Sequence, residues 1–211
     1  MLETRHETNC SKKKAMQLIE AATESIGLTQ GSIMERQEIL TLLNQYKSIQ
    51  HEIGLLLQQI ENLLEEIPGA KEMVTVPGVG MVVVAGFIAE VGNLEHYSHP
   101  RQIQKLAGLN LKENSSGKHK GQTRITKRGR SRLRALLYKC IMPLVAKNQE
   151  FKALHYYYTT RAQNPLKKKQ SLIALCCKLI RILFALGKKK TLYDGRELIK
   201  NNSVLSLQDA A

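Results

Sequence analysis

Tryptophan is absent from the 211-residue sequence, and aromatic residues together make up only 5% of it. The sequence therefore has few of the side chains that anchor basic amphipathic helices in a membrane surface. No apolar run reaches the roughly 18 residues that a membrane-spanning helix needs, and the first residues contain no apolar signal-peptide core. These absences predict a cytoplasmic protein without a membrane partner.

Cysteine is also scarce, and its spacing argues against a zinc site. The four cysteines form no Cys-x-x-Cys pair and lie at no ligand spacing from histidine. Cys176 and Cys177 fall in an apolar helical run, so we expect small buried residues and no disulfide. His96 and His99 have no cysteine or carboxylate at ligand spacing, which favours surface or capping roles. The sequence predicts no metal and no cofactor in this chain.

Acidic residues are almost missing from one long stretch. Residues 101–190 contain 23 Lys or Arg and two acids, Glu113 and Glu150, a net charge of +21, whereas the rest of the chain has 9 basic and 16 acidic residues. A polyanion is the natural counterpart of such a segment, and nucleic acid fits better than a membrane. A ribosomal or structural RNA-binding protein would also explain this charge.

The charge is densest between Gly108 and Arg134, where nine cations accompany one acid. Each unpaired cation would cost several kcal/mol to bury, so this segment must face water or an anion. Within it, the run from Asn114 to Lys118 is typical of a turn and puts the hydroxyls of Ser115 and Ser116 at the tip of a loop. Two interpretations stay open. The serines are turn formers on a solvated face, or one of them attacks phosphorus while cations neutralise the developing charge.

Four motifs occur here in a fixed order: Ala107 to Leu109, Ser116 to Lys118, Arg124 to Gly129 and Leu133 to Leu136. This series resembles the C-terminal transposase domain of the insertion-sequence one-hundred-and-ten family, over roughly residues 74–194. Members of that family are DNA recombinases guided by a bridge RNA. The resemblance implies that Ser116 is a nucleophile that forms a phosphoserine link to DNA. The candidate DNA-binding cations of this segment are Lys118, Lys120, Arg124, Lys127, Arg128, Arg130 and Arg134.

In the same family, a RuvC-like domain with four acidic metal ligands precedes the transposase domain. Nothing in this sequence matches it, because the acids before Val74 lie on predicted helices. The resemblance therefore implies a partial or split transposase, with Mg²⁺ expected on a separately encoded RuvC-like domain. It also implies DNA and a guide RNA as partners. The alternative is a non-catalytic, dimeric nucleic-acid-binding module.

A helix is predicted from Ser11 to Ile26 and a longer one from Ser32 to Pro68. The longer one carries apolar residues at steps of three and four, which is typical of a coiled coil. Its partner is either a second copy of the chain or the first helix folded back, and the shortness of the first helix favours a homo-oligomer. We call this row of apolar residues the seam; it consists of Ile39, Leu42, Tyr46, Ile49, Ile53, Leu56, Ile60, Leu63 and Ile67.

The sequence Pro77-Gly78-Val79-Gly80 precedes an apolar run from Met81 to Val91. The valines of this run favour a strand by propensity. A Pro-Gly-Val-Gly turn before an alanine-containing apolar run instead looks like a helix-hairpin-helix, and we predict a helix. In that motif the amides near Gly78 and Gly80 would contact a DNA phosphate. An ordinary turn is the alternative.

Three more helices are predicted: one from Ser131 with a kink at Pro143, one from Phe151 to Arg161, and one from Pro165 to Gly187. Tyr156, Tyr157 and Tyr158 cannot all face a core, so an exposed one could stack on a base or act as a nucleophile. The predicted fold is all-α. Its predicted domains are a helical coiled-coil segment (1–68), a transposase domain (69–195) and a flexible tail (196–211).

Overall fold

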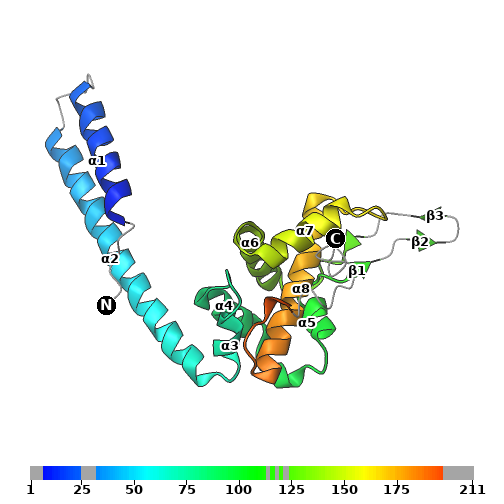
Figure 1. Ribbon diagram of the computed structural model, residues 1–211. Helices are drawn as coiled ribbons and strands as arrows, with labels where there is room; N and C mark the ends of the chain where they lie inside the picture. Colours follow the sequence, from blue (N-terminus) through cyan, green and yellow to red (C-terminus); the bar gives the residue numbers. More distant parts are fainter. Residues whose placement is uncertain (1–6, 25–31, 113–114, 117–118, 121–123, 197–211) are drawn as a thin grey trace. The chain divides into compact units, whose positions relative to one another are not determined.

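A computed structural model describes residues 7–24, 32–112, 115–116, 119–120 and 124–196. Eight α-helices and four strands of two residues each lie within these ranges, which confirms the all-α prediction (Figure 1). The chain forms two compact units, Met1–Gly54 and Leu55–Ala211. The predicted boundary between residues 68 and 69 stays a prediction, and the predicted tail falls almost entirely outside the described residues.

The first unit contains α1 (Glu7–Glu24) and most of α2 (Ser32–Glu66). Helix α2 begins at the predicted residue and ends just before Pro68, which cannot continue a helix. Its seam is exposed to solvent: the exposed fraction is 58% for Ile39, 61% for Tyr46 and 55% for Ile49. In the described part of this unit, α1 therefore does not bury the seam.

The end of α2 belongs to the second unit and joins its core. Leu64 is buried, and Ile60 packs against the same cluster. Gly69 follows with a φ of 84°, and a Cβ there would collide with the backbone of Gly187 on α8 (Lys168–Lys189). Two of the predicted seam residues, Ile60 and Ile67, thus pack against the core of the second unit.

Helix α8 forms the centre of this unit, because α3 (Ala70–Val74), α5 (Pro100–Leu106), α6 (Ser131–Lys147) and α7 (Gln149–Thr160) all pack against it. Its length and hydropathy would suit a membrane span, but half of that stretch is buried in the domain, as a core helix requires. Leu175, Leu179 and Leu183 are fully buried.

The prediction that Gly187 ends the last helix is wrong. Helix α8 continues to Lys189, and Lys190 caps it with a left-handed φ of 53°. Gly187 is instead a site of close packing, because a Cβ there would collide with Met73 and Leu94. A glycine near a helix end predicts a stop only when no neighbouring element needs the space.

Helix α4 (Met81–Val91) confirms the prediction of a helix where propensity favoured a strand. Burial explains this outcome, because Val84, Phe87 and Val91 lie on one face and enter the core. The valines therefore pack as helix residues, and tertiary contacts override the intrinsic preference.

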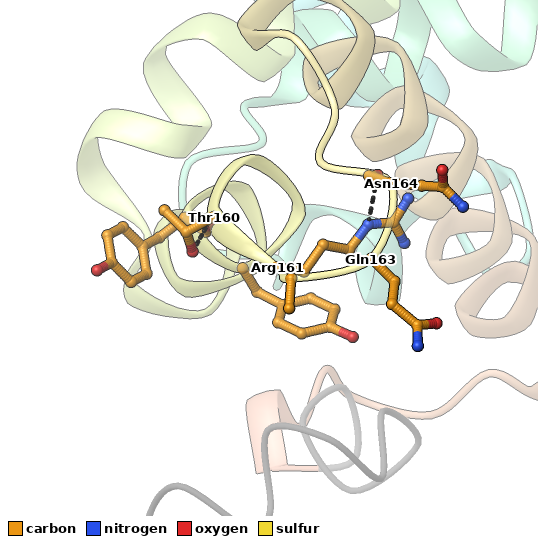
Figure 2. Close-up of a pocket in the computed structure, with 7 residues that line it drawn as sticks. Thr160, Arg161, Gln163 and Asn164 are labelled. Carbon is orange, nitrogen blue, oxygen red and sulfur yellow. Dashed lines mark hydrogen bonds between the residues drawn. The ribbon is translucent and has the colours of Figure 1, made fainter.

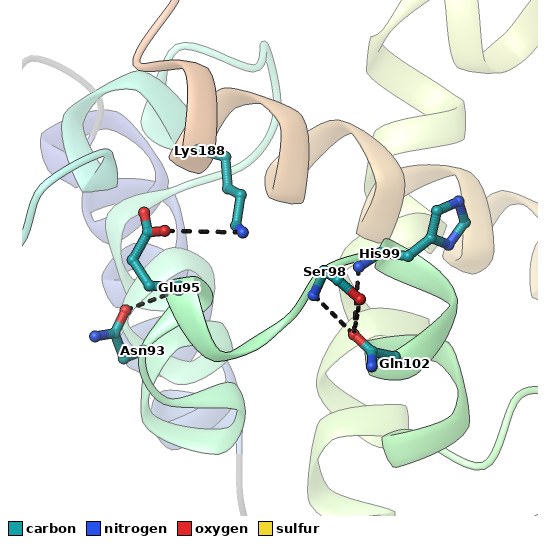
Figure 3. A network of polar contacts seen from close by, with 6 residues as sticks. All are labelled: Asn93, Glu95, Ser98, His99, Gln102 and Lys188. Atoms are coloured by element: carbon teal, nitrogen blue, oxygen red, sulfur yellow. Dashed lines mark hydrogen bonds and ion pairs between the residues drawn. The ribbon is translucent and has the colours of Figure 1, made fainter.

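A 3₁₀ turn, η1 (Leu94–His96), leads from α4 to α5, whose start is capped by its own flanking side chains (Figure 3). His99 Nδ1 accepts a hydrogen bond from the Arg101 N–H at 3.1 Å. Gln102 Oε1 accepts hydrogen bonds from the Ser98 and His99 N–H groups at 2.9 and 3.2 Å. The predicted capping role of His99 is confirmed.

Three cysteines of the second unit are free thiols, and burial keeps them in the neutral form. Burial raises the pKa of Cys140 to about 11 and raises the pKa of Cys176 further. These residues behave as small apolar side chains of the core, as predicted.

Candidate nucleic-acid interface

The serine loop, which we define as residues 108–134, contains short antiparallel pairs where only a turn was predicted. β1 (Leu111–Lys112) pairs with β4 (Arg124–Ile125), and β2 (Ser115–Ser116) pairs with β3 (His119–Lys120). Ser116 stands opposite His119 in the register. The second pair lies beyond the first, away from the helices (Figure 1). Lys118 and the side chains of Ser116 and Lys120 lie outside the described residues.

The base of this loop is closed by backbone hydrogen bonds between its two arms. The Thr126 N–H donates to the Asn110 carbonyl at 2.7 Å, and the Lys127 N–H donates to the Gly108 carbonyl at 3.0 Å. Gly108 has a φ of 68°, and a Cβ on it would lie 2.7 Å from the Arg128 carbonyl oxygen. The glycine of the first predicted motif is therefore needed for close contact with the third motif.

Gly129 completes this contact from the other arm. Its φ is 142°, and a Cβ there would collide with the Leu106 carbonyl oxygen at the end of α5. The Arg130 N–H donates to the same carbonyl at 2.7 Å. The loop is thus attached at its base to α5 and to the first turn of α6.

Arg130 and Arg134, two of the predicted phosphate-binding cations, donate hydrogen bonds to backbone carbonyls of the protein. Arg134 Nη1 donates hydrogen bonds to the Ala107 carbonyl at 2.9 Å and to the Lys127 carbonyl at 3.4 Å. Arg130 Nη1 donates to the Glu90 carbonyl at 2.6 Å and lies 3.7 Å from the Glu90 carboxylate. The structure therefore gives Arg134 a positioning role at the loop base. The side chains of Arg124, Lys127 and Arg128 are exposed, as is that of Arg130.

The predicted hairpin connects α3 and α4, and its two glycines are exposed. Val76 and Val79 anchor it in the core, and Asn148 Nδ2 donates a hydrogen bond to the Pro77 carbonyl at 3.2 Å. Gly78 has a φ of 95° and lies against Leu144, so it is required by the fold. Gly80 precedes α4 in an extended conformation with open space around its α-carbon. Only Gly80 can therefore be replaced without straining the turn.

One of the three consecutive tyrosines is exposed, as predicted: Tyr156 has an exposed fraction of 69%. It lines a pocket of about 550 Å³ with Tyr157 and with the chain that follows α7 (Figure 2). Arg161 Nε donates a hydrogen bond to the Asn164 carbonyl at 2.9 Å across the rim. Tyr158 is half-buried, and the Arg161 guanidinium lies 6.0 Å from the centre of its ring.

A larger groove of about 1260 Å³, which we call the basic groove, lies between α5, α8 and the base of the serine loop. Arg124 and Lys127 of the predicted site line it. The other cations that line it come from two helices and were not among the predicted site residues. They are Arg101, Lys105, Lys169, Lys178 and Arg181.

A signal for part of this groove is present in the sequence. Lys178 and Arg181 lie three residues apart on a helix that is otherwise apolar, so they share one face of it. The lysine runs at the two ends of α8 are a stronger charge signal in the sequence than this pair. The partners on α5 could not be found in this way, since only folding brings them opposite α8.

Within the described ranges, no group of three or more His, Cys, Asp or Glu side chains could hold a metal ion. The described residues therefore do not fit a Mg²⁺ site, and no step is assigned to a metal on them.

The two hydrogen bonds of Arg134 lead to a stability prediction. Arg134→Ala should lower the free energy of unfolding by about 1.5–3 kcal/mol, the typical value of a hydrogen bond to a charged group. Arg132→Ala, which removes an exposed guanidinium two residues away on the same helix, is the control and should change it by less than about 0.5 kcal/mol. Urea unfolding followed by circular dichroism measures both, and equal effects would rule out the positioning role.

Comparison with known proteins shows that part of this chain is similar to a transposase family. Residues 70–156 match the Transposase IS116/IS110/IS902 family. The chain is 26% identical over 179 residues to an uncharacterized 44.8 kDa protein of insertion element IS116 from Streptomyces clavuligerus, covering 85% of this chain and 44% of that protein. It is 28% identical over 103 residues to the transposase of insertion sequence element IS1328 from Yersinia enterocolitica, covering 48% and 31% respectively.

A shorter match has higher identity: 38% over 63 residues with a putative transposase, y4qE, of Sinorhizobium fredii, covering 30% of this chain and 16% of that protein. The matches cover less than half the length of each of these relatives. Residues 70–156, which include the hairpin, α5, the serine loop and α6, are therefore the part of the chain that is similar to the Transposase IS116/IS110/IS902 family.

Proposed function

We propose that this chain is the DNA-binding and serine-bearing part of an insertion-sequence transposase that acts on DNA in the cytoplasm. The observation that carries the proposal is the family match over residues 70–156, which contains the densest cationic segment of the chain. Exposed Arg124, Lys127 and Arg128 on a loop with a closed base support phosphate binding. A non-catalytic binding module is the second candidate, supported by the exposed seam of α2.

The proposed chemistry is attack of the Ser116 hydroxyl on a DNA phosphodiester. The serine oxygen forms a bond to phosphorus, a bond from phosphorus to a deoxyribose oxygen breaks, and the departing oxygen takes up a proton. The number of phosphoester bonds is unchanged, so no external energy source is needed. His119, the register partner of Ser116 and the one histidine of the loop sequence, is the proposed proton acceptor.

The proposal extends to partners that the chain does not contain. A separately encoded RuvC-like domain would supply acidic ligands and Mg²⁺, and a guide RNA would select the target, as the family resemblance implies. The chain spans less than half the length of each of these relatives. We therefore expect this chain alone to bind DNA and to cleave it barely or not at all.

DNA binding should be strongly dependent on salt and largely independent of sequence. If six to ten phosphates are neutralised, the affinity should fall by about 10³ to 10⁵ between 50 and 200 mM salt. Gly80→Val should weaken binding to all sequences alike, because its side chain would cover the amides at the start of α4. Gly54→Val, at another exposed glycine with open space around it, is the control. A gel-shift titration without this salt dependence would remove nucleic acid as the main partner.

The nucleophile can be tested with a suicide DNA substrate in the presence of the RuvC-like domain, Mg²⁺ and guide RNA. A covalent adduct should form, and Ser116→Ala should abolish it while binding persists, since one neutral hydroxyl contributes only about 1 kcal/mol to contact. Ser115→Ala is the matched control and should retain the adduct.

Denaturing electrophoresis and peptide mapping locate the link. An adduct that survives Ser116→Ala, or one mapped to exposed Tyr156, would overturn the assignment. Binding without any adduct under these conditions would favour the non-catalytic module.

We also propose that the chain forms a homo-oligomer through the seam of α2. The exposed fractions of 55% for Ile49 and 57% for Leu56 support this, because a row of such side chains is stable in water only when a partner covers it. Ile60 is less suitable for a test, since it also packs against the core of the second unit.

Ile49→Lys with Leu56→Lys should therefore produce a monomer, because two charges would enter a dry interface. His51→Lys with Gln58→Lys places the same charges, at the same seven-residue spacing, on the opposite face and should leave the oligomer intact. Sedimentation velocity at micromolar concentration measures the outcome. A wild-type chain that is already monomeric would show that α2 does not associate with itself.

A further inference from the structure

We infer that the basic groove holds an unpaired DNA strand, with phosphates against its cationic walls and bases against its apolar floor. The inference rests on the proposed function, because it names the form of DNA that a transposase domain would hold beside its serine loop. The groove lies outside the hairpin and the loop tip, so it adds a separate binding site to the same unit.

The walls of the groove are cationic on both sides. Arg101 and Lys105 lie one turn apart on α5 and are exposed, and Lys178 and Arg181 lie one turn apart on α8. No acidic side chain is among the described residues that line it. Like charges in such proximity repel, and an anion that bridges them relieves the repulsion. Charge complementarity therefore requires a polyanion with phosphates spaced along the groove.

Lys178 by itself also favours the binding of an anion. Its pKa is lowered, first because burial penalises the charged form and then because Arg181 lies nearby. A cation that is half-buried next to another cation gains the most when a phosphate arrives, since both penalties are then offset. This lysine is thus placed to bind an anion and has no wall carboxylate as an alternative.

The floor of the groove is apolar, which a phosphate backbone alone does not use. Leu109 is buried and the others are partly exposed, so the floor offers hydrocarbon surface in the same groove as the cations. Base faces match this surface, and they stack on apolar and aromatic side chains without regard to sequence. The floor consists of Leu109, Ile125, Tyr158, Leu166, Ile173 and Cys177.

These two features select an unpaired strand over a duplex. A duplex keeps its base faces stacked inside and presents only phosphates and base edges, which leaves the floor unmatched. An unpaired strand presents phosphates and base faces together. The volume of about 1260 Å³ also exceeds the roughly 300–1,000 Å³ of a small-molecule site, which suits several consecutive nucleotides.

The two walls are held at a set separation before any ligand binds. Gln104, which is 8% exposed, donates a hydrogen bond from Nε2 to the Cys177 carbonyl at 3.0 Å and so ties α5 to α8. The N–H of Leu166 donates to the Tyr158 carbonyl at 2.8 Å and fixes the end of the floor. Binding then costs little backbone ordering, because the helices that carry the groove's side chains are already positioned.

The test measures fluorescence anisotropy of the full chain with four labelled probes of one length: a DNA strand, its duplex, an abasic strand, and RNA of the same sequence. The wild type should bind the DNA strand about tenfold more tightly than the abasic strand, the scale of losing one stacked base. It should also prefer the strand to the duplex.

Lys178→Gln with Arg181→Gln should remove the preference for the DNA strand over the duplex. The control, Lys139→Gln with Lys152→Gln, makes the same change in net charge at exposed positions on α6 and α7 and should keep that preference. Leu166→Ser should reduce the difference between the normal and abasic strands without changing charge. Thermal unfolding by circular dichroism confirms that each variant is folded.

The outcomes separate this inference from the proposed function. Equal binding of strand, abasic strand and duplex would overturn the inference and leave the salt-dependent DNA binding of the proposed function in place. Tighter binding of the RNA probe would also overturn it, because the occupant would then be RNA. Binding of no probe would overturn both.

Discussion

Most of the cations between residues 101 and 190 must reach water or an anion, since two acids cannot neutralise 23 basic residues. The second unit satisfies this constraint through α8, which is both its central helix and part of its charged surface. Leu175, Leu179 and Leu183 are buried, while Lys178 and Arg181 on the same helix line the basic groove. Only an amphipathic core helix can meet both requirements, because burying either cation fully would cost several kcal/mol.

The same constraint explains the serine loop. A segment with nine cations cannot be held by a hydrophobic core, so its base is held by backbone hydrogen bonds and by two glycines that allow the arms to approach. Arg134 contributes two further hydrogen bonds by directing its charge at carbonyl oxygens. A rigid base then carries Arg124, Lys127 and Arg128 at the surface, where a phosphate can reach them.

Much of the fold was predictable because local patterns agreed with the tertiary structure. The seam of α2 predicted its limits, the Pro-Gly signal predicted its end, and His99 predicted the cap of α5. The prediction for Gly187 was wrong, since the packing of Met73 and Leu94 against it cannot be read from neighbouring residues. The strand pairs of the loop escaped prediction for a related reason. Pairing Leu111 with Ile125 depends on the contact between Gly108 and Gly129, which are 21 positions apart.

By itself, the sequence predicted that the chain is helical, required one segment to face water or an anion, and supplied the motif from which the family resemblance implies Ser116. These properties depend on residue type and short spacing, which survive in any arrangement of the helices. Only the tertiary structure decided which cations act on the fold and which are available to a ligand. It assigned Arg134 to the loop base, distinguished Gly78 from Gly80, and brought Arg101 and Lys105 opposite Lys178 and Arg181. The physical reason is that a charge has the same sequence signature whether its partner is a carbonyl of the chain or a phosphate from outside.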